Sequence, residues 1–531
     1  MPNVREALYE LMRSLNLTTV FGNPGSTEET FLRDFPSDFE YILGLQEASV
    51  VAMADGYAQA TRNPVLVNLH TAAGMGNAMG NIASAWHNRA PLIILAGQQT
   101  REMLLLEPYL TNLQATQLPQ PYVKWSYETT RAEDAPAALM RAYAAAIQAP
   151  AGPVFLSIPM DDLDKPFEGR IPSRKVSRDL QVSREEMQAT AALLANAKAP
   201  AMIVGGAVDR NEGWRHVTAL AERLACPVWA APQEGRPGFP ETHPLFQGSA
   251  PSAIGLLSKA MEGHDLVLVI GAPVFRYYPF LDGEYLPSGT KLVQIVDDPQ
   301  EAARAPVGDS ILADPAKACA VLADLIPQSR RPAPPSPEPL KKPELSEMIT
   351  PDLLFHELEK LRPRDSILVQ ESLSNLKNLR RRLPTAHSSS FYSMTSGVLG
   401  YGLPAAVGVS LAQRHNKSSR RVVCVVGDGA AQYVIQSLWS AAQLNLPILF
   451  LVVRNGQYGI LKAFAEFQET PAVPGLDLPG IDSVKLAQGY GCTAVSVNDP
   501  GELSSVIRKG LDSDGPYLIE VVVSSEVPPL V

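Results

Sequence analysis

The chain has 531 residues, of which 46% are hydrophobic and 19% charged, and its formal net charge is −10. This length exceeds what one hydrophobic core supports and predicts about three domains of ordinary globular composition. The acidic balance excludes nonspecific nucleic-acid binding, which requires a basic surface, and no apolar run in the sequence approaches the roughly 18 residues of a transmembrane helix, so we expect neither nucleic acid nor membrane as a partner.

The first third of the chain alternates predicted helices and strands. Helical spacing covers residues 5–15 and 75–86 and begins again at Gln46, and predicted strands cover residues 18–21, 41–45, 65–69, 92–96 and 153–158. This alternation is typical of a parallel sheet with helices on both faces. Ligands bind beyond the carboxyl ends of such strands, which is where residues 23–26, Glu47 and His70 fall. Taken singly, each has an ordinary structural interpretation, such as Ser26 as a helix N-cap.

Three glycines after the third predicted strand suggest a dinucleotide fingerprint at first sight. They are Gly74, Gly76 and Gly80, and the third comes one position too late for G-x-G-x-x-G. We therefore expect close helix packing here rather than NAD binding.

The middle of the chain predicts a second α/β block between two linkers. Residues 165–183 are polar and break the apolar periodicity, and residues 329–345 are rich in proline and charge, which is typical of an extended tether. Predicted strands between them lie at residues 202–204, 266–270 and 292–296. The pairs Gly205-Gly206 and Asp297-Asp298 carry no complete nucleotide fingerprint, so structural turns are the favoured interpretation.

The last third contains the most informative stretch, residues 422–460. A predicted strand at 422–426 leads into Gly427-Asp428-Gly429, then helical spacing through residue 446, a strand at 447–453, and Asn455-Gly456-Gln457. A right-handed crossover places both strand ends on the same edge of the sheet, so Asp428 and Asn455 should meet there. A carboxylate and an amide oxygen, with backbone carbonyls, suit a hard cation such as Mg²⁺. The glycines and the helix start suit a diphosphate, although GDG and Asn-Gly are each also ordinary turn signals.

Further elements surround this unit. Predicted helices cover residues 351–361, 404–412, 458–467 and 482–488, and predicted strands cover 366–370 and 518–523. The helix at 458–467 directly follows Asn455 and would cover the site. Four cysteines are scattered without metal-ligand spacing, so we expect free thiols in a reducing cytoplasm; they are Cys226, Cys319, Cys424 and Cys492. The N-terminus lacks the uninterrupted apolar stretch of a secretory signal.

Several segments resemble the thiamine-diphosphate-dependent 2-keto acid decarboxylases, in particular the members that act on benzoylformate. These segments are FGNPGS at residues 21–26, LQEA at 45–48, NLHTAAG at 68–74, GQQT at 97–100, VIGAPVFRY at 269–277 and VPGLDLPGID at 473–482. The GDG motif followed by Asn455 is similar to the cofactor motif of the same family, and the likeness spans nearly the whole chain.

The resemblance implies an α/β fold of three doubly wound parallel-sheet domains. The expected boundaries are a pyrimidine-binding domain at 1–170, a central Rossmann-like domain at 184–328, a Pro-rich linker at 329–345 and a diphosphate- and Mg²⁺-binding domain at 346–531. It also implies a homo-oligomer, expected to be a tetramer built as a dimer of dimers, in which two domains from different subunits meet at each cofactor.

The activity implied is a carbon-carbon lyase reaction. Thiamine diphosphate with Mg²⁺, for which Ca²⁺ can substitute, would remove CO₂ from an aromatic 2-keto acid, converting benzoylformate to benzaldehyde through ylid addition and an enamine. The catalytic residues implied are Glu47 facing the pyrimidine N1′, His70 moving protons, and Ser26 binding the substrate carboxylate.

The resemblance also implies a set of binding residues. Asp428, Asn455 and the backbone carbonyl of Gln457 would hold the metal. The cofactor-binding set is Asn23, Pro24, Gly25, Glu47, Leu399, Gly427, Asp428, Gly429, Ala430, Asn455, Gln457, Tyr458, Gly459 and Ile460. Leu399 matches the apolar residue beneath the bent cofactor. The substrate pocket implied is Ser26, His70, Tyr278, Leu373, Ser393, Leu461 and Phe464.

Departures from the family pattern keep alternatives open. Tyr278 stands where a second active-site histidine is expected, and a tyrosine hydroxyl is a poor proton shuttle near neutral pH. Ala430 replaces a serine after GDG, and Ser393 and Leu373 alter the pocket. A thiamine-dependent carboligase or a decarboxylase of a different 2-keto acid is therefore the alternative within this chemistry. A noncatalytic cofactor-binding protein is a further alternative, and an NAD-linked oxidoreductase is the least favoured.

Overall fold

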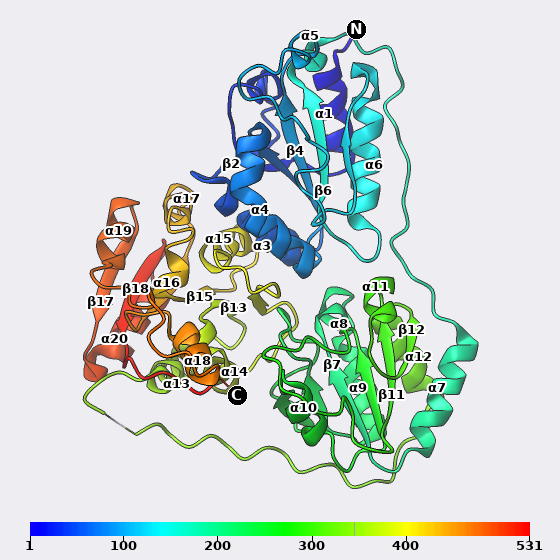
Figure 1. Cartoon of the computed structure of the whole chain (residues 1–531), viewed down its shortest axis with the longest axis vertical. Coiled ribbons are helices and arrows are strands. Elements are labelled where there is room, and N and C mark those ends of the chain that lie inside the picture. Colours follow the sequence, from blue (N-terminus) through cyan, green and yellow to red (C-terminus); the bar gives the residue numbers. More distant parts are fainter. Residues whose placement is uncertain (345, 531) are drawn as a thin grey trace.

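A computed structural model describes residues 1–344 and 346–530 and contains three α/β units. Each unit has one six-stranded sheet, and every strand pair in the three sheets is parallel. Figure 1 shows the first unit, in blue and cyan, above the third (yellow to red) and the second (green). The predicted fold class of three doubly wound parallel sheets is confirmed. Among the described residues, no helix is both long and apolar enough to span a bilayer.

The first sheet has the strand order β2-β1-β3-β4-β6-β5. Its strands are β1 (Thr19–Asn23), β2 (Glu40–Leu43), β3 (Val65–Leu69), β4 (Leu92–Gln98), β5 (Ser126–Glu128) and β6 (Val154–Pro159). The helices of this unit are α1 (Val4–Ser14), α2 (Glu29–Leu32), α3 (Glu47–Thr61), α4 (Thr71–Asn88), α5 (Arg101–Leu104) and α6 (Ala135–Ile147), with 3₁₀ turns η1 (Ala132–Asp134) and η2 (Met160–Asp164).

The second sheet has the order β12-β11-β10-β7-β8-β9. Its strands are β7 (Pro200–Val204), β8 (Val228–Ala230), β9 (Phe246–Ser249), β10 (Leu266–Ile270), β11 (Lys291–Val296) and β12 (Asp309–Leu312). Its helices are α7 (Arg184–Asn196), α8 (Gly206–Arg210), α9 (Trp214–Leu224), α10 (Ile254–Ala260), α11 (Pro299–Ala303) and α12 (Pro315–Leu325).

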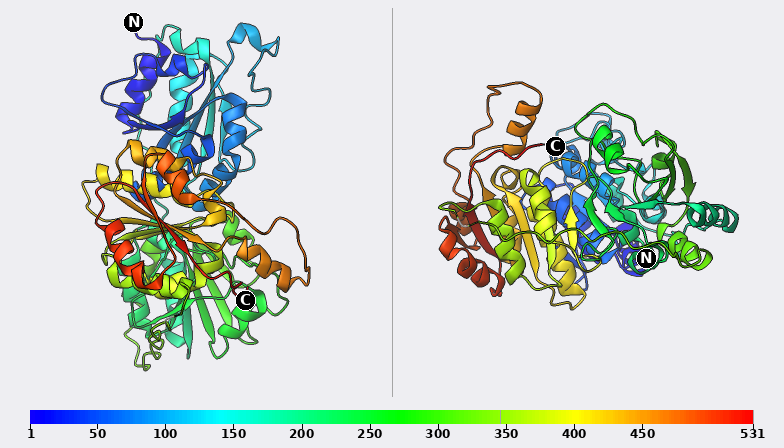
Figure 2. Two further views of the ribbon diagram at one scale, coloured as in Figure 1. Left: turned by 90° about the vertical axis from the view of Figure 1, so that its left-hand side faces the viewer. Right: turned by 90° about the horizontal axis from the view of Figure 1, so that it is seen from below.

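The third sheet has the order β14-β13-β15-β16-β18-β17. Its strands are β13 (Ile367–Glu371), β14 (Phe391–Ser393), β15 (Val422–Gly427), β16 (Ile448–Arg454), β17 (Thr493–Val497) and β18 (Tyr517–Val522). Its helices are α13 (Pro351–Leu361), α14 (Leu376–Arg382), α15 (Gly402–His415), α16 (Asp428–Ala431), α17 (Ser437–Gln443), α18 (Gly459–Phe467), α19 (Ser483–Gly489) and α20 (Pro500–Leu511), with the 3₁₀ turn η3 (Leu373–Asn375). Figure 2 shows the orange segment that contains α18 projecting from this unit.

The long predicted strands are all present, because their continuous apolar runs are buried on both faces as a parallel sheet requires. The short strands β5, β8, β9, β12, β14 and β17 were not predicted. The single helix expected between β15 and β16 is wrong: the chain forms α16 and α17, separated by i→i+3 hydrogen bonds such as Val434 N to Ala431 O. The predicted linker 329–345 and third domain 346–531 end on Leu345 and Val531, which lie outside the described residues, and the expected domain boundaries stay predictions.

The first and third units pack through α3 and α15, which face each other across the junction in Figure 1. Both helices are rich in small residues, so their backbones approach closely. A Cβ added at Gly56 would lie 2.3 Å from Ala405 O, and one added at Gly408 would lie 1.9 Å from Met53 O. Only glycine fits at these two crossings, and the contact fixes how the two sheets sit relative to each other.

A buried polar network joins all three units beside this helix pair. The Gln59 amide on α3 donates to Asp55 Oδ1 at 2.7 Å and to the Tyr401 hydroxyl of the third unit at 3.1 Å. From the second unit, Arg236 donates to the Gln59 carbonyl at 3.1 Å and to Asp209 at 2.8 Å. Asp55 is fully buried, and this burial raises its pKa to about 6. The bonds from Gln59 to Tyr401 and from Arg236 to the Gln59 carbonyl form only when the three units are assembled.

Candidate active site

The first group of predicted site residues gathers at the carboxyl edge of the first sheet. Asn23 ends β1 and lies opposite Leu69 of β3, directly before His70. Helix α3 begins at Glu47, because the side chain of Gln46 accepts hydrogen bonds from the amides of residues 48 and 49 and caps the helix. The predicted meeting of residues 23–26, Glu47 and His70 at one sheet edge is thus observed.

The sequence did not point to Glu28, which is central to this edge. Its side chain is 1% exposed, and it accepts hydrogen bonds from the amides of Gly97 (2.8 Å) and Gly25 (3.1 Å) and from the Thr27 hydroxyl (2.8 Å). His70 Nδ1 lies 2.7 Å from Glu28 Oε2. Because a carboxylate only accepts, Nδ1 carries the proton, which leaves Nε2 of the neutral ring as a proton acceptor. Nothing in the sequence distinguishes buried Glu28 from its exposed neighbour Glu29.

The Glu47 side chain, at the start of α3, contacts the first two turns of α4. Asn77 Nδ2 donates to Glu47 Oε2 at 3.0 Å, and a Cβ added at Gly74 would lie 3.3 Å from Glu47 Cγ. Gly74 therefore leaves room for this carboxylate, which agrees with the packing interpretation of the glycines in α4. Gly76 has no neighbour within 4 Å of such a Cβ, so close packing does not explain it.

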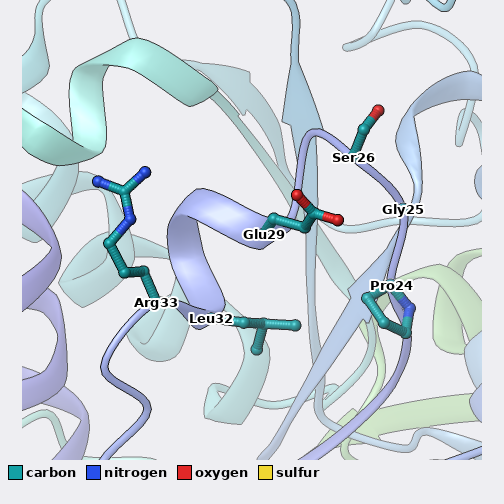
Figure 3. Close-up of a pocket in the computed structure, with 6 residues that line it drawn as sticks. All are labelled: Pro24, Gly25, Ser26, Glu29, Leu32 and Arg33. Carbon is teal, nitrogen blue, oxygen red and sulfur yellow. The ribbon is translucent and has the colours of Figure 1, made fainter.

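Ser26 lies at the open side of this edge. A hollow of about 480 Å³ is lined by Pro24, Gly25, Ser26, Glu29, Leu32 and Arg33. Figure 3 shows Ser26 on the loop and the last three residues on or directly after α2. The Arg33 guanidinium is paired with Asp164 at 2.8 Å, so its charge is already compensated. The Ser26 hydroxyl is an uncharged donor that lines the same hollow.

The second group gathers at the carboxyl edge of the third sheet. Asp428 follows β15 and is 4% exposed, and its Oδ2 accepts from the Gly456 amide, directly after β16, at 2.8 Å. Asn455 Oδ1 accepts from the Gln457 amide at 3.2 Å. The predicted meeting of Asp428 with the Asn455 turn is therefore present, as the crossover between adjacent parallel strands requires.

The oxygens at this edge fit a hard cation. They comprise the Asp428 carboxylate, the Asn455 amide oxygen and the carbonyl of Gln457, whose side chain is engaged by Ser525 O (2.7 Å) and Lys462 (2.6 Å). Burial raises the pKa of Asp428, so the charge gains from a compensating cation. In the described part of the chain, no three His, Cys, Asp or Glu side chains form a metal cluster. An ion here would need oxygens from a ligand, as Mg²⁺ does at phosphates.

The remaining cofactor residues lie around the same edge. Gly427 precedes α16, where Gly429 and Ala430 are buried, and a Cβ added at Gly429 would lie 2.6 Å from the Tyr458 ring. Gly459 opens α18 with Ile460, next to Ser374 of η3. Leu399 lies on the turn before α15, half-buried against the core shared by the first and third sheets. These contacts are compatible with the predicted roles and do not test them.

Two of the predicted pocket residues meet where α18 lies against the loop after β10, and a third lies nearby on the same helix. The rings of Tyr278 and Phe464 have centroids 4.9 Å apart, and Leu461 is exposed one turn before Phe464. Leu373 begins η3 and packs half-buried against the core. Ser393 is 5% exposed; its hydroxyl accepts from Gln370, and its amide donates to Gly235 O at 2.9 Å. Among the described residues, no hydrogen bond joins the Ser393 hydroxyl to Tyr278 or Phe464.

Polar contacts do not join the two edges within the described part of one chain. Within residues 1–344 and 346–530, no hydrogen bond or ion pair joins Ser26, Glu47 or His70 to Asp428 or Asn455. Among the described residues, hydrogen bonds link α4 to residues 395–400 of the third unit at three places only. They join Asn81 to Gly400 O (2.9 Å), Ser84 to Ser396 (2.8 Å) and Thr395 to Asn88.

Comparison with known proteins assigns each unit. Residues 2–118 match the N-terminal TPP binding domain of thiamine pyrophosphate enzymes, residues 187–325 the central domain and residues 376–521 the C-terminal TPP binding domain. The chain is 44% identical to a benzoylformate decarboxylase of Pseudomonas aeruginosa, over 98% of this chain and 99% of that protein.

Two solved structures are similar over the full chain. A benzoylformate decarboxylase from Polynucleobacter necessarius has a TM-score of 0.99 and 46% identity, with 100% of both chains covered. A thiamine diphosphate-dependent 4-hydroxybenzoylformate decarboxylase from Rhodococcus jostii RHA1 has a TM-score of 0.96 and 41% identity, with 99% of both chains covered.

Proposed function

The chain belongs to the thiamine pyrophosphate enzyme family, and from this we propose that it is a lyase that decarboxylates an aromatic 2-keto acid, with benzoylformate giving benzaldehyde and CO₂. One observation carries the proposal: two separate sheet edges hold the residue types that this chemistry needs. One edge presents Glu47, His70 and Ser26, and the other presents Asp428 and Asn455.

The residues at both edges suit thiamine diphosphate and Mg²⁺. Asp428, Asn455 and the Gln457 carbonyl would hold Mg²⁺, for which Ca²⁺ can substitute, together with the diphosphate. A Cβ added at Gly427 would have no neighbour closer than 3.9 Å, so this position leaves room for phosphate beside α16. Glu47 would face the pyrimidine, and Leu399 would support it from the third unit. When bound, the cofactor supplies the electron sink that no side chain provides, so that the carbon-carbon bond to CO₂ can break.

The chain's own residues orient the substrate and move protons. The Ser26 hydroxyl would donate to the substrate carboxylate before that group leaves as CO₂. His70 would exchange a proton through Nε2, because Glu28 holds the proton on Nδ1. Glu47 would donate a hydrogen bond to the pyrimidine and accept one from Asn77, which fixes its direction.

A second function is supported by one specific observation. Tyr278 stands at the sequence position where a second histidine is expected, and its ring packs tilted against Phe464, with the centroids 4.9 Å apart. A tyrosine hydroxyl is weakly acidic and would deliver protons slowly, and slow protonation would give time for addition to a second aldehyde. Carboligation, or decarboxylation of a bulkier 2-keto acid, is therefore the alternative outcome at the same site.

The proposed assembly is a homo-oligomer with sites shared between subunits, built as a tetramer of two dimers. Among the described residues of one chain the two edges share no polar contact, and apolar side chains after α5 are strongly exposed: Leu105 is 93% exposed, Leu106 73% and Tyr109 88%. A cluster of this kind on one chain is a typical oligomer interface. The four buried free cysteines support a cytoplasmic location.

The decisive experiment measures CO₂ release from benzoylformate with thiamine diphosphate and Mg²⁺, comparing wild type with Glu47→Gln. Turnover by wild type and its near-complete loss in the isosteric variant are expected, while Glu10→Gln, at an exposed position of α1, serves as the control. Near-normal turnover by Glu47→Gln would overturn the role of Glu47. Absence of turnover by wild type on a panel of aromatic 2-keto acids would overturn the function.

A further inference from the structure

Glu371 is a buried carboxylate at the carboxyl end of β13, in the interior of the third unit. It is 0% exposed. Its Oε1 accepts from the Gly400 amide at 2.6 Å, and its Oε2 accepts from the amides of Tyr401 (3.0 Å) and Gly402 (2.6 Å). Three consecutive backbone N–H groups thus converge on one side chain.

These hydrogen bonds make Glu371 the cap of α15. The N-cap residue of this helix, Tyr401, provides no side-chain hydrogen bond. Other helices of the chain are capped locally, for example α13 by Thr350 and α12 by Asp314. A cap supplied by a strand end instead ties the helix start, and the turn before it, to the third sheet.

The carboxylate has no cationic partner among the described residues. Burial raises the pKa of Glu371 to about 7, and the three backbone N–H groups oppose the increase. Burying a carboxyl group without a cationic partner makes the free energy of folding less favourable. A role in positioning the backbone of residues 400–402 therefore explains the buried Glu371 better than a contribution to stability.

Those atoms belong to the turn that carries Leu399. Gly397 and Gly400 adopt φ values of +76° and +102°, which give the turn its shape. Its other side is held by the first unit, where Asn81 donates to Gly400 O at 2.9 Å. A Cβ at Gly402 would lie 2.9 Å from Glu371 Cβ, so glycine is needed for this approach.

We propose that Glu371 is a positioning residue of the active site. Its three hydrogen bonds fix the position of the turn and the direction of the Leu399 side chain, and with them the geometry in which the cofactor is held. This inference rests on the proposed function through the role of Leu399. In Glu371→Gln, an amide group would face at least one of the N–H donors in place of an acceptor oxygen. The turn would then relax away from β13, although the fold of the sheet would remain.

The test is the rate of hydrogen–deuterium exchange at C2 of thiamine diphosphate bound to the protein with Mg²⁺, measured by NMR after acid quench. This rate reports how the bound cofactor is held, and it needs no substrate. We expect Glu371→Gln to bind the cofactor within threefold of the wild-type affinity and to exchange at least tenfold more slowly. Glu371→Asp, which keeps the charge but has a shorter reach, should also be slowed.

Glu241→Gln is the matched control. Glu241 is another buried carboxylate, and it accepts a hydrogen bond from the backbone amide of Thr385 at 2.8 Å. Among the described residues, it forms no hydrogen bond with the turn or with α15. Its exchange rate should equal that of wild type. Wild-type exchange in Glu371→Gln overturns the inference. If Glu371→Gln does not fold, wild-type exchange in Glu371→Asp overturns the inference. Loss of cofactor binding in both variants also overturns it and indicates a purely structural role for Glu371. Exchange by wild type no faster than that of free cofactor refutes the proposed function instead.

Discussion

The His70 ring donates a 2.7 Å hydrogen bond from Nδ1 to the Glu28 carboxylate, and the two residues come from different elements at the edge of the first sheet. The same carboxylate is fixed by the Gly25 and Gly97 amides. The imidazole is thereby held in one tautomer and one direction. A histidine with this support can exchange protons repeatedly without turning.

Glu28→Gln tests this pair. The amide would present either an N–H or an oxygen to Nδ1, so the tautomer would no longer be fixed, and we expect kcat to fall about tenfold or more with an altered pH profile. Steady-state kinetics between pH 5.5 and 8 measure both effects. The control is Glu40→Gln, which alters a Glu–His pair (Glu40–His415, 2.9 Å) at the amino end of β2, away from the carboxyl ends of the strands where both groups of site residues lie. An unchanged kcat in Glu28→Gln would remove the assigned role.

Asp428→Asn tests the metal site. Loss of the carboxylate should weaken Mg²⁺ and cofactor binding, because a neutral amide oxygen is a poorer ligand for a hard cation. The rise in Tm that thiamine diphosphate with Mg²⁺ gives to wild type should be largely absent in the variant. Asp482→Asn, an exposed helix cap in the same unit, should retain the full rise. An equal rise in both variants would show that the metal binds elsewhere.

Tyr278→His tests the balance between decarboxylation and carboligation. Restoring an imidazole should speed protonation, so the ratio of aldehyde to ligation product should increase when an acceptor aldehyde is present. Gas chromatography of the products measures this ratio. Tyr285→His, on the same loop and 37% exposed, should leave the ratio unchanged. If Tyr278→His produces no more aldehyde than wild type, the hydroxyl is not the limiting group.

Leu105→Asp tests the proposed assembly. The wild-type side chain is 93% exposed in one chain, so a charge there costs the monomer little but would be buried in an interface. Sedimentation velocity should show a smaller species, with activity falling in parallel if the sites are shared. The control is Leu193→Asp on α7, where the leucine is 41% exposed. A wild-type sedimentation coefficient for Leu105→Asp would exclude this surface.

Asp55→Asn tests the junction of the three units through pH. Burial raises the pKa of Asp55 to about 6, so between about pH 4 and pH 6 the folded protein keeps a proton that the unfolded chain has lost. Wild-type stability relative to the variant should therefore fall as pH rises through this window, by about 3 kcal/mol in total, and stay constant above it. The difference in Tm at pH 5, 6 and 7 measures this trend, and a difference that increases with pH would contradict it.

Much of the architecture could be predicted from the sequence. Alternating apolar runs and helical spacing predict parallel sheets, and runs such as Val65–Leu69 and Leu266–Ile270 match observed strands end to end. The meeting of Asp428 with the Asn455 turn also follows from the sequence, because adjacent parallel strands end at the same edge. The short strands could not be predicted, since three to five residues are too few to show a clear periodicity.

The sequence by itself therefore determined which residues lie at each strand end, and with them the chemistry of both edges. Only the tertiary structure decided which carboxylates are buried among them. Glu28 and Glu371 look ordinary in the sequence, yet each is enclosed by backbone N–H groups from segments far away in the chain. Burial and hydrogen-bond partners depend on how separate elements pack together, and local sequence patterns report only the periodicity within each element.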